Sequence, residues 1–257
     1  MEQIIVVKVG GKVVENPEAL NGLIKGFSAL KCRKVMVHGG GVMATRVADA
    51  MGIKTTMVEG RRITSDQMID VVTMVYGGLV NKRIVAQLQH HSVKAVGLCG
   101  ADMNIMLADR RPPVKGIDYG WVGDVKHVDG KALSTIVESG VVPVIAPLTH
   151  DGKGQLLNTN ADTIAAEVAK GLASLYDVTL VYCFEKNGVL LNPDDDDSVL
   201  HSLKASQYEA MKEMGIIKDG MVPKLDNAFS TLKHGVKEVI ITSAASLGDL
   251  SRGTHIK

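Results

Sequence analysis

Six short apolar runs rich in β-branched residues recur along the chain, and most are continuous rather than alternating in polarity. Strands that are covered on both faces have this pattern, which is typical of parallel sheets. The sequence therefore predicts strands at Ile4–Val9, Val35–Val37, Ala95–Leu98, Val141–Ala146, Val178–Cys183 and Glu238–Thr242.

Between these runs, apolar residues recur with the spacing of helices that bury one face. Two helix starts carry clear signals. Asn16-Pro17-Glu18 combines an N-cap, a first-turn proline and an acidic residue, and Thr64-Ser65-Asp66-Gln67 has capping-box spacing. Helices are predicted over about 16–30, from 64 onward, and over about 130–139, 161–171 and 220–234. Strands alternating with helices predict an α/β fold, an open sheet with helices on both faces.

Three segments depart from this alternation. Residues 103–128, which include Arg110-Arg111-Pro112-Pro113 and several glycines, predict a hairpin at the edge of the sheet. A smaller hairpin is expected at about 54–63. The acidic run Asp194–Asp197 lacks the spacing of a calcium loop and is interpreted as a solvated turn.

The composition excludes several classes of protein. The chain has 257 residues, of which 46% are hydrophobic and 22% charged, and its net charge is +1. It is thus neither disordered nor built to bind nucleic acid or an anionic membrane with its whole surface. The three cysteines (Cys32, Cys99 and Cys183) form no zinc pattern, no apolar run reaches ~18 residues, and Met1-Glu2-Gln3 is no signal peptide. We expect a cytoplasmic protein with reduced thiols.

Candidate chemistry follows the first two predicted strands. Ligands of open α/β sheets bind at the carboxyl ends of strands, and the glycine turns Gly10-Gly11 and Gly39–Gly41 lie there. Such turns can offer backbone N–H groups to anions, although each could also be a turn without a ligand. Lys8 interrupts an apolar run, so its ammonium group must be paired or functional unless it reaches solvent at a sheet edge.

A dinucleotide site is one hypothesis for the second turn. Residues 39–44 match the GxGxxA pattern between a strand and a helix, and Glu59 follows about 20 residues later. Against it, the match falls on the second strand, and Glu59 lies beside Gly60-Arg61-Arg62 rather than at a strand end. The sequence contains neither a Walker A motif nor the HRD and DFG motifs of protein kinases.

A set of short motifs runs through the whole chain: Lys8-x-Gly10-Gly11, His38-Gly39-Gly40-Gly41, Gly60-x-Arg62-x-Thr64, Asn158-x-Asn160-Ala161-Asp162, Asp219-Gly220-Met221 with Lys224, and Gly253-Thr254. In this order and spacing, the set resembles the amino acid kinase family.

The resemblance implies a three-layer αβα sandwich around a mainly parallel open sheet, as a single domain over residues 1–257. An N-terminal lobe, about 1–172, would bind an N-acyl-L-glutamate and form a homodimer, and a C-terminal lobe, about 173–257, would bind ATP. The chain is most similar to members that phosphorylate the γ-carboxylate of N-acetyl-L-glutamate in arginine biosynthesis. Mg²⁺ would be held mainly by the ATP phosphates, without a metal site on the protein.

The resemblance also implies roles for individual residues. Lys8 and Lys224 would stabilise the transferring phosphoryl group, and Asp162 would orient both lysines. The substrate would contact Gly40 and Gly41 at its reacting end and Arg62 and Asn158 at its α-carboxylate. The nucleotide would contact Gly10, Gly11, Glu185, Gly188, Val189, Ile216 and Ile217.

Alternatives remain open at several of these positions. Arg62 and Lys224 could be surface residues, and Asn160 could be a helix cap only. The segment Glu185–Val189 departs from the Asp-Val-x-Gly-Val pattern that is common in the family, and Pro223 before Lys224 is unusual. The substrate could instead be N-succinyl-L-glutamate or the substrate of another member, such as a carbamate, aspartate, glutamate or uridylate kinase.

The resemblance also bears on inhibition by arginine. By the same resemblance, members that arginine inhibits carry an additional N-terminal helix that links dimers into hexamers. About three residues precede the first predicted strand, so we expect a homodimer that arginine does not inhibit.

Overall fold

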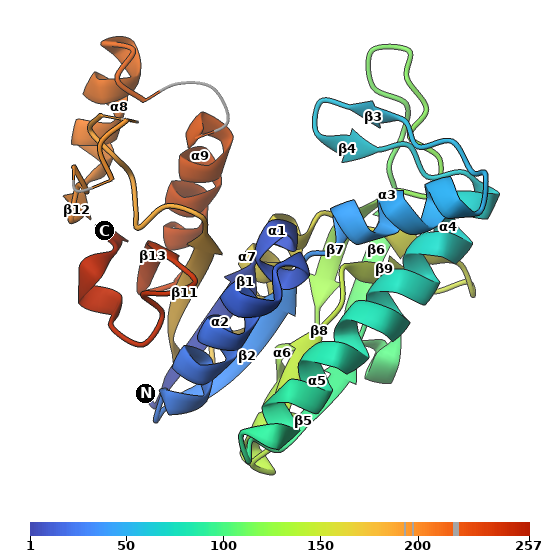
Figure 1. Cartoon of the computed structure of the whole chain (residues 1–257), viewed down its shortest axis with the longest axis horizontal. Helices are drawn as coiled ribbons and strands as arrows, with labels where there is room; N and C mark the ends of the chain where they lie inside the picture. Colours follow the sequence, from blue (N-terminus) through green and yellow to red (C-terminus); the bar gives the residue numbers. More distant parts are fainter. Residues whose placement is uncertain (193, 197, 218–220) are drawn as a thin grey trace.

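The computed structural model describes residues 1–192, 194–196, 198–217 and 221–257. In these segments, eight strands form the main sheet (Figure 1), in the order β12 (Ser202–Leu203), β14 (Thr254–Ile256), β13 (Glu238–Ser243), β11 (Asp177–Phe184), β1 (Gln3–Val9), β2 (Arg33–His38), β8 (Val142–Ile145) and β5 (Ala95–Leu98). Neighbouring strands are parallel except β13 and β14. All six predicted strands are therefore confirmed.

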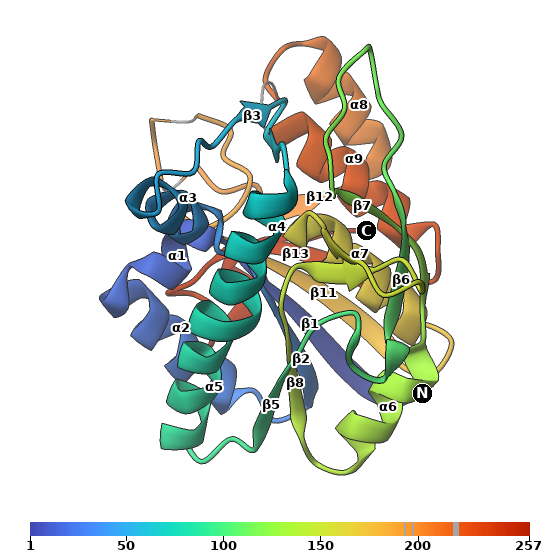
Figure 2. The same cartoon turned by 90° about the vertical axis from the view of Figure 1, so that its right-hand side faces the viewer.

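The continuous apolar runs arise because each central strand is buried on both faces. Along β1, Val6 belongs to one hydrophobic core and Val7 to the other. The first core packs against α6 (Gly130–Glu138), α7 (Ala161–Leu172), α8 (Ala205–Glu213) and α9 (Met221–Leu232). The second packs against α2 (Pro17–Ala29), α3 (Gly41–Ala50), α4 (Asp66–Val72) and α5 (Asn81–His90). Figure 2 shows the sheet between these groups, which confirms the three-layer sandwich.

The segment 103–128 forms the predicted hairpin, but its expected place at the edge of the main sheet is wrong. Its strands β6 (Met106–Arg110) and β7 (Gly123–Val128) join β9 (Leu148–His150) and β10 (Leu156–Asn158) in a separate sheet of order β10-β9-β6-β7. Pro147 follows β8, and the chain then turns into β9, which pairs with β6. The smaller predicted hairpin is confirmed as β3 (Met57–Val58) and β4 (Arg61–Arg62).

Helix starts follow their capping chemistry. Asn16 accepts hydrogen bonds from the backbone of Glu18 and Ala19, which confirms the predicted start of α2. The predicted capping box at Thr64 is wrong by one residue, because Ser65 caps α4 and the buried Thr64 hydroxyl donates to the Arg62 carbonyl instead.

The remaining helical segments are short or irregular. A π-helical segment, Thr73–Val80, joins α4 to α5 in one long rod, and α1 (Gly11–Glu15) lies just before α2. The described chain also has 3₁₀ turns at Asp102–Asn104 and Leu250–Arg252. None of the described helices is long and apolar enough to cross a membrane.

The proposed lobe boundary falls at the end of α7 and divides the main sheet in the middle. Strands from residues before 172 occupy the side β1-β2-β8-β5, and strands after it occupy the side β11-β13-β14-β12. Because β1 pairs with β11 over seven residues, the two halves share one continuous sheet. Above its carboxyl edge, α8 and α9 rise on one side and β3 and β4 on the other (Figure 1).

Candidate active site

The two glycine turns lie against each other at the carboxyl edge of the sheet. Gly10 precedes α1 after β1, and Gly40 precedes α3 after β2. A Cβ atom on Gly39 would lie 3.0 Å from the Gly11 nitrogen, and one on Gly11 would lie 3.4 Å from the Gly40 nitrogen. Glycine favours this close backbone approach, because a Cβ atom on Gly39 would be tighter against the other turn than most Cβ contacts, and the N–H groups of both turns lie close together.

A buried histidine supports the second turn from below. One ring nitrogen of His38 lies 2.8 Å from the Gly39 carbonyl, which can only accept, so this nitrogen carries the hydrogen. The other nitrogen accepts from the Asn81 amide at 3.1 Å. Because complete burial disfavours the imidazolium ion, the pKa of His38 falls to about 4. His38 is therefore a neutral support rather than a proton donor at neutral pH.

Lys8 and Asp162 form an ion pair at the same edge. The Lys8 Nζ atom lies 2.8 Å from Asp162 Oδ1, and Lys8 is only 6% exposed. Lys8 comes from β1, whereas Asp162 stands in the first turn of α7, which Asn160 caps. The expectation that Lys8 is paired is thus met, and the side chain of Asn160 is a helix cap.

Lys224 of α9 approaches from the other half of the sheet. Its Nζ atom lies 3.8 Å from the centroid of the Phe184 ring, and the same ring has Lys8 Nζ at 5.1 Å. Burial lowers the pKa of Lys224, Asp162 raises it, and Lys8 lowers it again. Lys8, Asp162 and Lys224 are far apart in sequence, but they place two cations and one carboxylate near the ends of β1 and β11. The predicted Asp219-Gly220 part of the motif lies outside the described residues.

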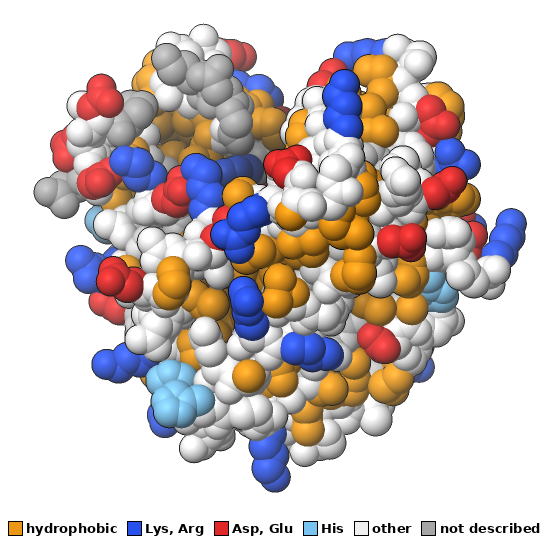
Figure 3. Space-filling view, turned by 45° about the vertical axis from the view of Figure 1, so that its right-hand side comes forward, with side chains coloured by type: hydrophobic (Ala, Val, Ile, Leu, Met, Phe, Trp, Pro, Cys, Tyr) orange, Lys and Arg blue, Asp and Glu red, His pale blue; other side chains and the backbone are white. Residues whose placement is uncertain are grey.

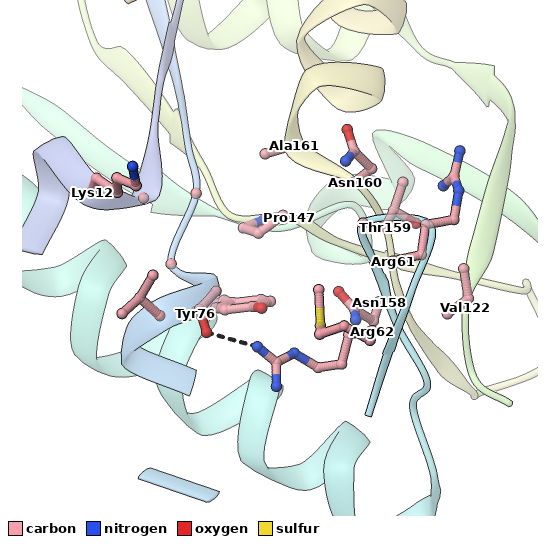
Figure 4. Close-up of a pocket in the computed structure, with 17 residues that line it drawn as sticks. Lys12, Arg61, Arg62, Tyr76, Val122, Pro147, Asn158, Thr159, Asn160 and Ala161 are labelled. Atoms are coloured by element: carbon pink, nitrogen blue, oxygen red, sulfur yellow. Dashed lines mark hydrogen bonds between the residues drawn. The ribbon is translucent and has the colours of Figure 1, made fainter. Parts of the chain in front are cut away.

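Arg62 lies at the base of a cavity of about 290 Å³ (Figure 4), whose lining includes Gly40, Gly41, Tyr76 and Asn158. Arg62 is only 6% exposed. Its Nη atoms donate to the Gly41 carbonyl at 2.7 Å and to the hydroxyls of Thr45 and Thr55. Its buried Nε has no partner among the described residues. An unpaired buried N–H costs free energy, so the site suits an added acceptor such as a carboxylate.

Further polar groups surround the cavity. The Asn158 amide donates to the Thr64 hydroxyl at 3.0 Å, which fixes it beside the β4 strand that carries Arg62. The lining does not include Lys8, Asp162 or Lys224. It does include Gly11, three residues after Lys8, and Ala161, directly before Asp162. The cavity therefore adjoins the cationic cluster. Figure 3 shows the molecule hollowed between its two projecting parts.

The predicted nucleotide residues are less closely grouped. Glu185 lies next to Phe184, is exposed, and pairs with Lys12 at 3.1 Å. Gly188 and Val189 pack on Thr254, whose hydroxyl accepts from the Val189 N–H. Ile217 is buried in the core around α8 and α9, whereas Ile216 is 41% exposed. The structure therefore brings Glu185 to the edge with the lysines, but it gives Gly188, Val189 and Ile217 packing contacts.

Two residues near the cluster were missed by sequence reasoning about the site. Lys12 lines the cavity beside Arg62 and also a second hollow beside Phe184 and Glu185, and its place directly after Gly10-Gly11 was the available signal. Phe184 offered no signal, because an aromatic residue at a strand end is typical of a core position.

The dinucleotide hypothesis for Gly39–Ala44 is not supported. Glu59 is exposed in the turn between β3 and β4 and lies 3.6 Å from Lys115, not at the end of a neighbouring strand. Within the described residues, no group of three or more His, Cys, Asp or Glu side chains could hold a metal ion.

Comparisons with known proteins identify the family. The family model described as "Amino acid kinase family" matches residues 3–243. An acetylglutamate kinase of Phocaeicola vulgatus is 55% identical over 256 residues, covering 100% of this chain and 99% of the relative. One of Cytophaga hutchinsonii is 51% identical, covering 97% and 95%. The N-acetylglutamate synthase of Neisseria gonorrhoeae, solved with coenzyme A and N-acetyl-glutamate, has a TM-score of 0.82 at 25% identity, covering 98% of this chain and 59% of that one. The chain belongs to the amino acid kinase family.

Proposed function

We propose that this protein transfers the γ-phosphoryl group of ATP to the γ-carboxylate of N-acetyl-L-glutamate, a step of arginine biosynthesis. The observation that carries the proposal is the Lys8–Asp162 ion pair with Lys224 beside it, next to a cavity with the unpaired Nε of Arg62. Full-length relatives named acetylglutamate kinase support the substrate and favour an acetyl over a succinyl group.

The chemistry requires charge neutralisation more than proton transfer. A carboxylate with a reference pKa near ~4.3 is already ionised at pH 7, so it attacks the phosphoryl group without a general base. The obstacle is the repulsion between this carboxylate and the triphosphate. Lys8 and Lys224 would neutralise charge on the transferring group, and Asp162 holds the Lys8 ammonium in place by the ion pair at 2.8 Å.

The substrate would bind with its α-carboxylate on Arg62 and Asn158. Hydrogen bonds from the Arg62 Nη atoms to the Gly41 carbonyl and to the hydroxyls of Thr45 and Thr55 fix the guanidinium plane, and its buried Nε has no partner among the described residues. Gly40 and Gly41 would direct backbone N–H groups at the reacting end. The cavity of about 290 Å³ is close to the smallest ligand sites of proteins, which suits a substrate of amino-acid size.

ATP would occupy the other side of the cluster. In this arrangement Gly10 and Gly11 hold phosphates, and Glu185, Gly188, Val189, Ile216 and Ile217 form the nucleotide side, within the lobe of residues 173–257. When bound, Mg²⁺ would offset the charge of the phosphate oxygens that hold it.

We further propose that the protein is a homodimer and is located in the cytoplasm. The N-terminal lobe would form a homodimer. The exposed Met51 and Met74 support a contact between subunits, since they line one surface depression together with Ile53. The three cysteines are free, which suits a protein of the reducing cytoplasm.

The test replaces each proposed catalytic lysine by methionine, which keeps the length of the side chain and removes its charge. We expect Lys8→Met and Lys224→Met to lower kcat about 10²–10³-fold in an assay of ADP release with N-acetyl-L-glutamate, the loss typical of one electrostatic donor. Lys25→Met, at an exposed position of α2, is the matched control and stays at wild-type activity. Near-normal turnover of both site variants, or higher kcat/KM with N-succinyl-L-glutamate, contradicts the proposal.

A further inference from the structure

Phe184 is the point where the two proposed catalytic lysines meet. It is the last residue of β11 and is partly buried. The Nζ atoms of Lys8 and Lys224 lie 5.1 Å and 3.8 Å from its ring centroid, both within the distance of a cation–π interaction. A side chain that touches both cations, one from β1 and one from α9, can influence how they are placed for the reaction.

The two lysines differ in their other partners. Lys8 has the carboxylate of Asp162 at 2.8 Å. For Lys224, no carboxylate of the described chain lies within ion-pair distance, and its Nζ atom instead lies over the Phe184 ring, 3.8 Å from the centroid. Burial lowers the pKa of Lys224, and the charges of Lys8 and Lys12 lower it further, whereas the charges of Asp162 and Glu185, which lie beyond ion-pair distance, raise it. Without the ring, this side chain would lose the group that holds its Nζ atom at the edge of the sheet.

An aromatic ring suits this position better than a carboxylate. Its face attracts an ammonium group through the ring quadrupole but carries no net charge. A carboxylate there would bind Lys224 more strongly, but it would also repel the phosphates that must enter the site. The ring therefore keeps Lys224 in place and leaves its charge available to an incoming anion.

The ring is itself held in a fixed orientation. Tyr182, two residues earlier on the same face of β11, stacks on it with planes 6° apart and centroids 5.9 Å apart. The Tyr182 hydroxyl accepts from the Asn227 amide of α9 at 3.2 Å and donates to the Asp162 carbonyl of α7 at 3.4 Å. Strand β11 thus connects the ring to the two helices that carry Lys224 and Asp162.

We propose that Phe184 is a positioning residue that holds the ammonium group of Lys224 against its ring, ready to take up the transferring phosphoryl group. The proposal rests on the role given to Lys224 above. Phe184 itself does not touch the substrate. The property that holds Lys224 is the aromatic face of the ring and not the apolar volume of the side chain.

The experiment compares Phe184→Leu, which keeps apolar bulk without the ring face, with Phe184→Tyr, which keeps the face. In ¹H–¹³C NMR of the full chain labelled at lysine, the ring current shifts the Lys224 ε-methylene signal upfield, and Lys224→Met assigns the signal. We expect Phe184→Leu to lose this shift and Phe184→Tyr to retain it. The readout needs no turnover, so it reports on the contact even if the proposed reaction is wrong.

Kinetics supply the second readout. We expect Phe184→Leu to lower kcat about tenfold and to move the alkaline limb of the kcat–pH profile to lower pH, because the ammonium form of Lys224 loses its support. Phe184→Tyr stays within about twofold of wild type. Phe229→Leu, which removes a ring that stacks on Tyr208 in the same half of the molecule, is the control for general loss of packing. An unchanged Lys224 signal in Phe184→Leu, or equal defects in the Leu and Tyr variants, overturns the proposal.

Discussion

His38 makes the stability of this protein depend on pH in a direction that can be calculated. Its pKa is about 4 in the folded protein and near ~6.5 in the unfolded chain, because burial disfavours the charged ring. Between these values the unfolded state binds the additional proton. The free energy of unfolding therefore falls as the pH is lowered from 6.5 toward 4, by up to roughly 3 kcal/mol from this group.

Urea unfolding at pH 7.5 and pH 5 measures this effect. We expect His38→Gln to be less stable than wild type at pH 7.5 but to lose less stability on acidification. The exposed His90, replaced by glutamine, is the matched control and should leave the pH dependence unchanged. If His38→Gln loses as much stability between the two pH values as wild type, the histidine is not the source.

At this scale the sequence identified residues whose chemistry conflicts with their surroundings. Lys8 was recognisable because a charge within an apolar run needs a partner, and Asp162 is that partner. Arg62 was singled out from Arg61 by the motif Gly60-x-Arg62-x-Thr64, but its burial was not predictable, since only the packing of β4 buries Arg62 and leaves Arg61 partly exposed. Phe184 could not be recognised from the sequence, because an aromatic residue at the end of a strand is typical of an ordinary core position.

At the scale of the elements, the C-terminal end of helix α2 is capped by a positive charge from strand β2. The Lys34 ammonium of β2 donates to the carbonyls of Phe27 and Leu30 at 2.8 Å and of Ser28 at 3.2 Å. These carbonyls belong to the last turn and the C-cap of α2, where few backbone donors remain, and the Phe27 carbonyl also accepts from the Leu30 N–H at 3.3 Å. Lys34 therefore caps the helix with a full positive charge at the negative end of its dipole.

Replacing Lys34 by methionine tests this capping role. The variant keeps the aliphatic stem but removes the ammonium donor from three carbonyls, so we expect a loss of about 2–3 kcal/mol in the free energy of unfolding. Thermal and urea unfolding measure the loss, and activity at 25 °C should persist because α2 contributes none of the proposed site residues. Lys94→Met, at an exposed position, should change stability by less than about 0.5 kcal/mol. A comparable stability of the two variants contradicts the capping role.

Sequence reasoning located regular elements better than irregular ones. The spacing from Met68 onward predicted a helix, but not the π-helical turn that brings Tyr76 against Gly40, where an added Cβ would lie 3.0 Å from the ring. That turn packs against the glycine loop, and no local sequence pattern predicts this contact. The edge placement of residues 103–128 failed similarly, since pairing between β6 and β9 is decided by tertiary contact.

For the whole molecule, the homodimer is the prediction that sedimentation can check. We expect a dimer at micromolar concentration, and we expect a Met51→Glu/Met74→Glu double variant to sediment as a monomer, since it places two charges on the proposed contact. Met214→Glu changes an exposed methionine near α8 and should leave the dimer intact. A wild-type monomer, or a dimer unaffected by the double change, rules out this surface.

The order of the strands in the main sheet could not be predicted from the sequence either. Six strands could be located, but their neighbours follow from how α2 and α7 cover opposite faces, and β12 and β14 are too short for a recognisable pattern. The resemblance gave the general architecture, and the structure added that both halves share one sheet through β1 and β11.

The central position of β1 has a consequence for synthesis on the ribosome. Strand β1 is paired on one side by β2, which follows within some thirty residues, but its other partner, β11, lies near residue 180. At roughly 5–20 residues per second, the apolar edge of β1 stays open for on the order of ten seconds or more while the intervening chain is made. An unpaired edge of this kind is a template for wrong pairing between chains. The strand that carries Lys8 is thus also the segment of the nascent chain that most needs protection from aggregation.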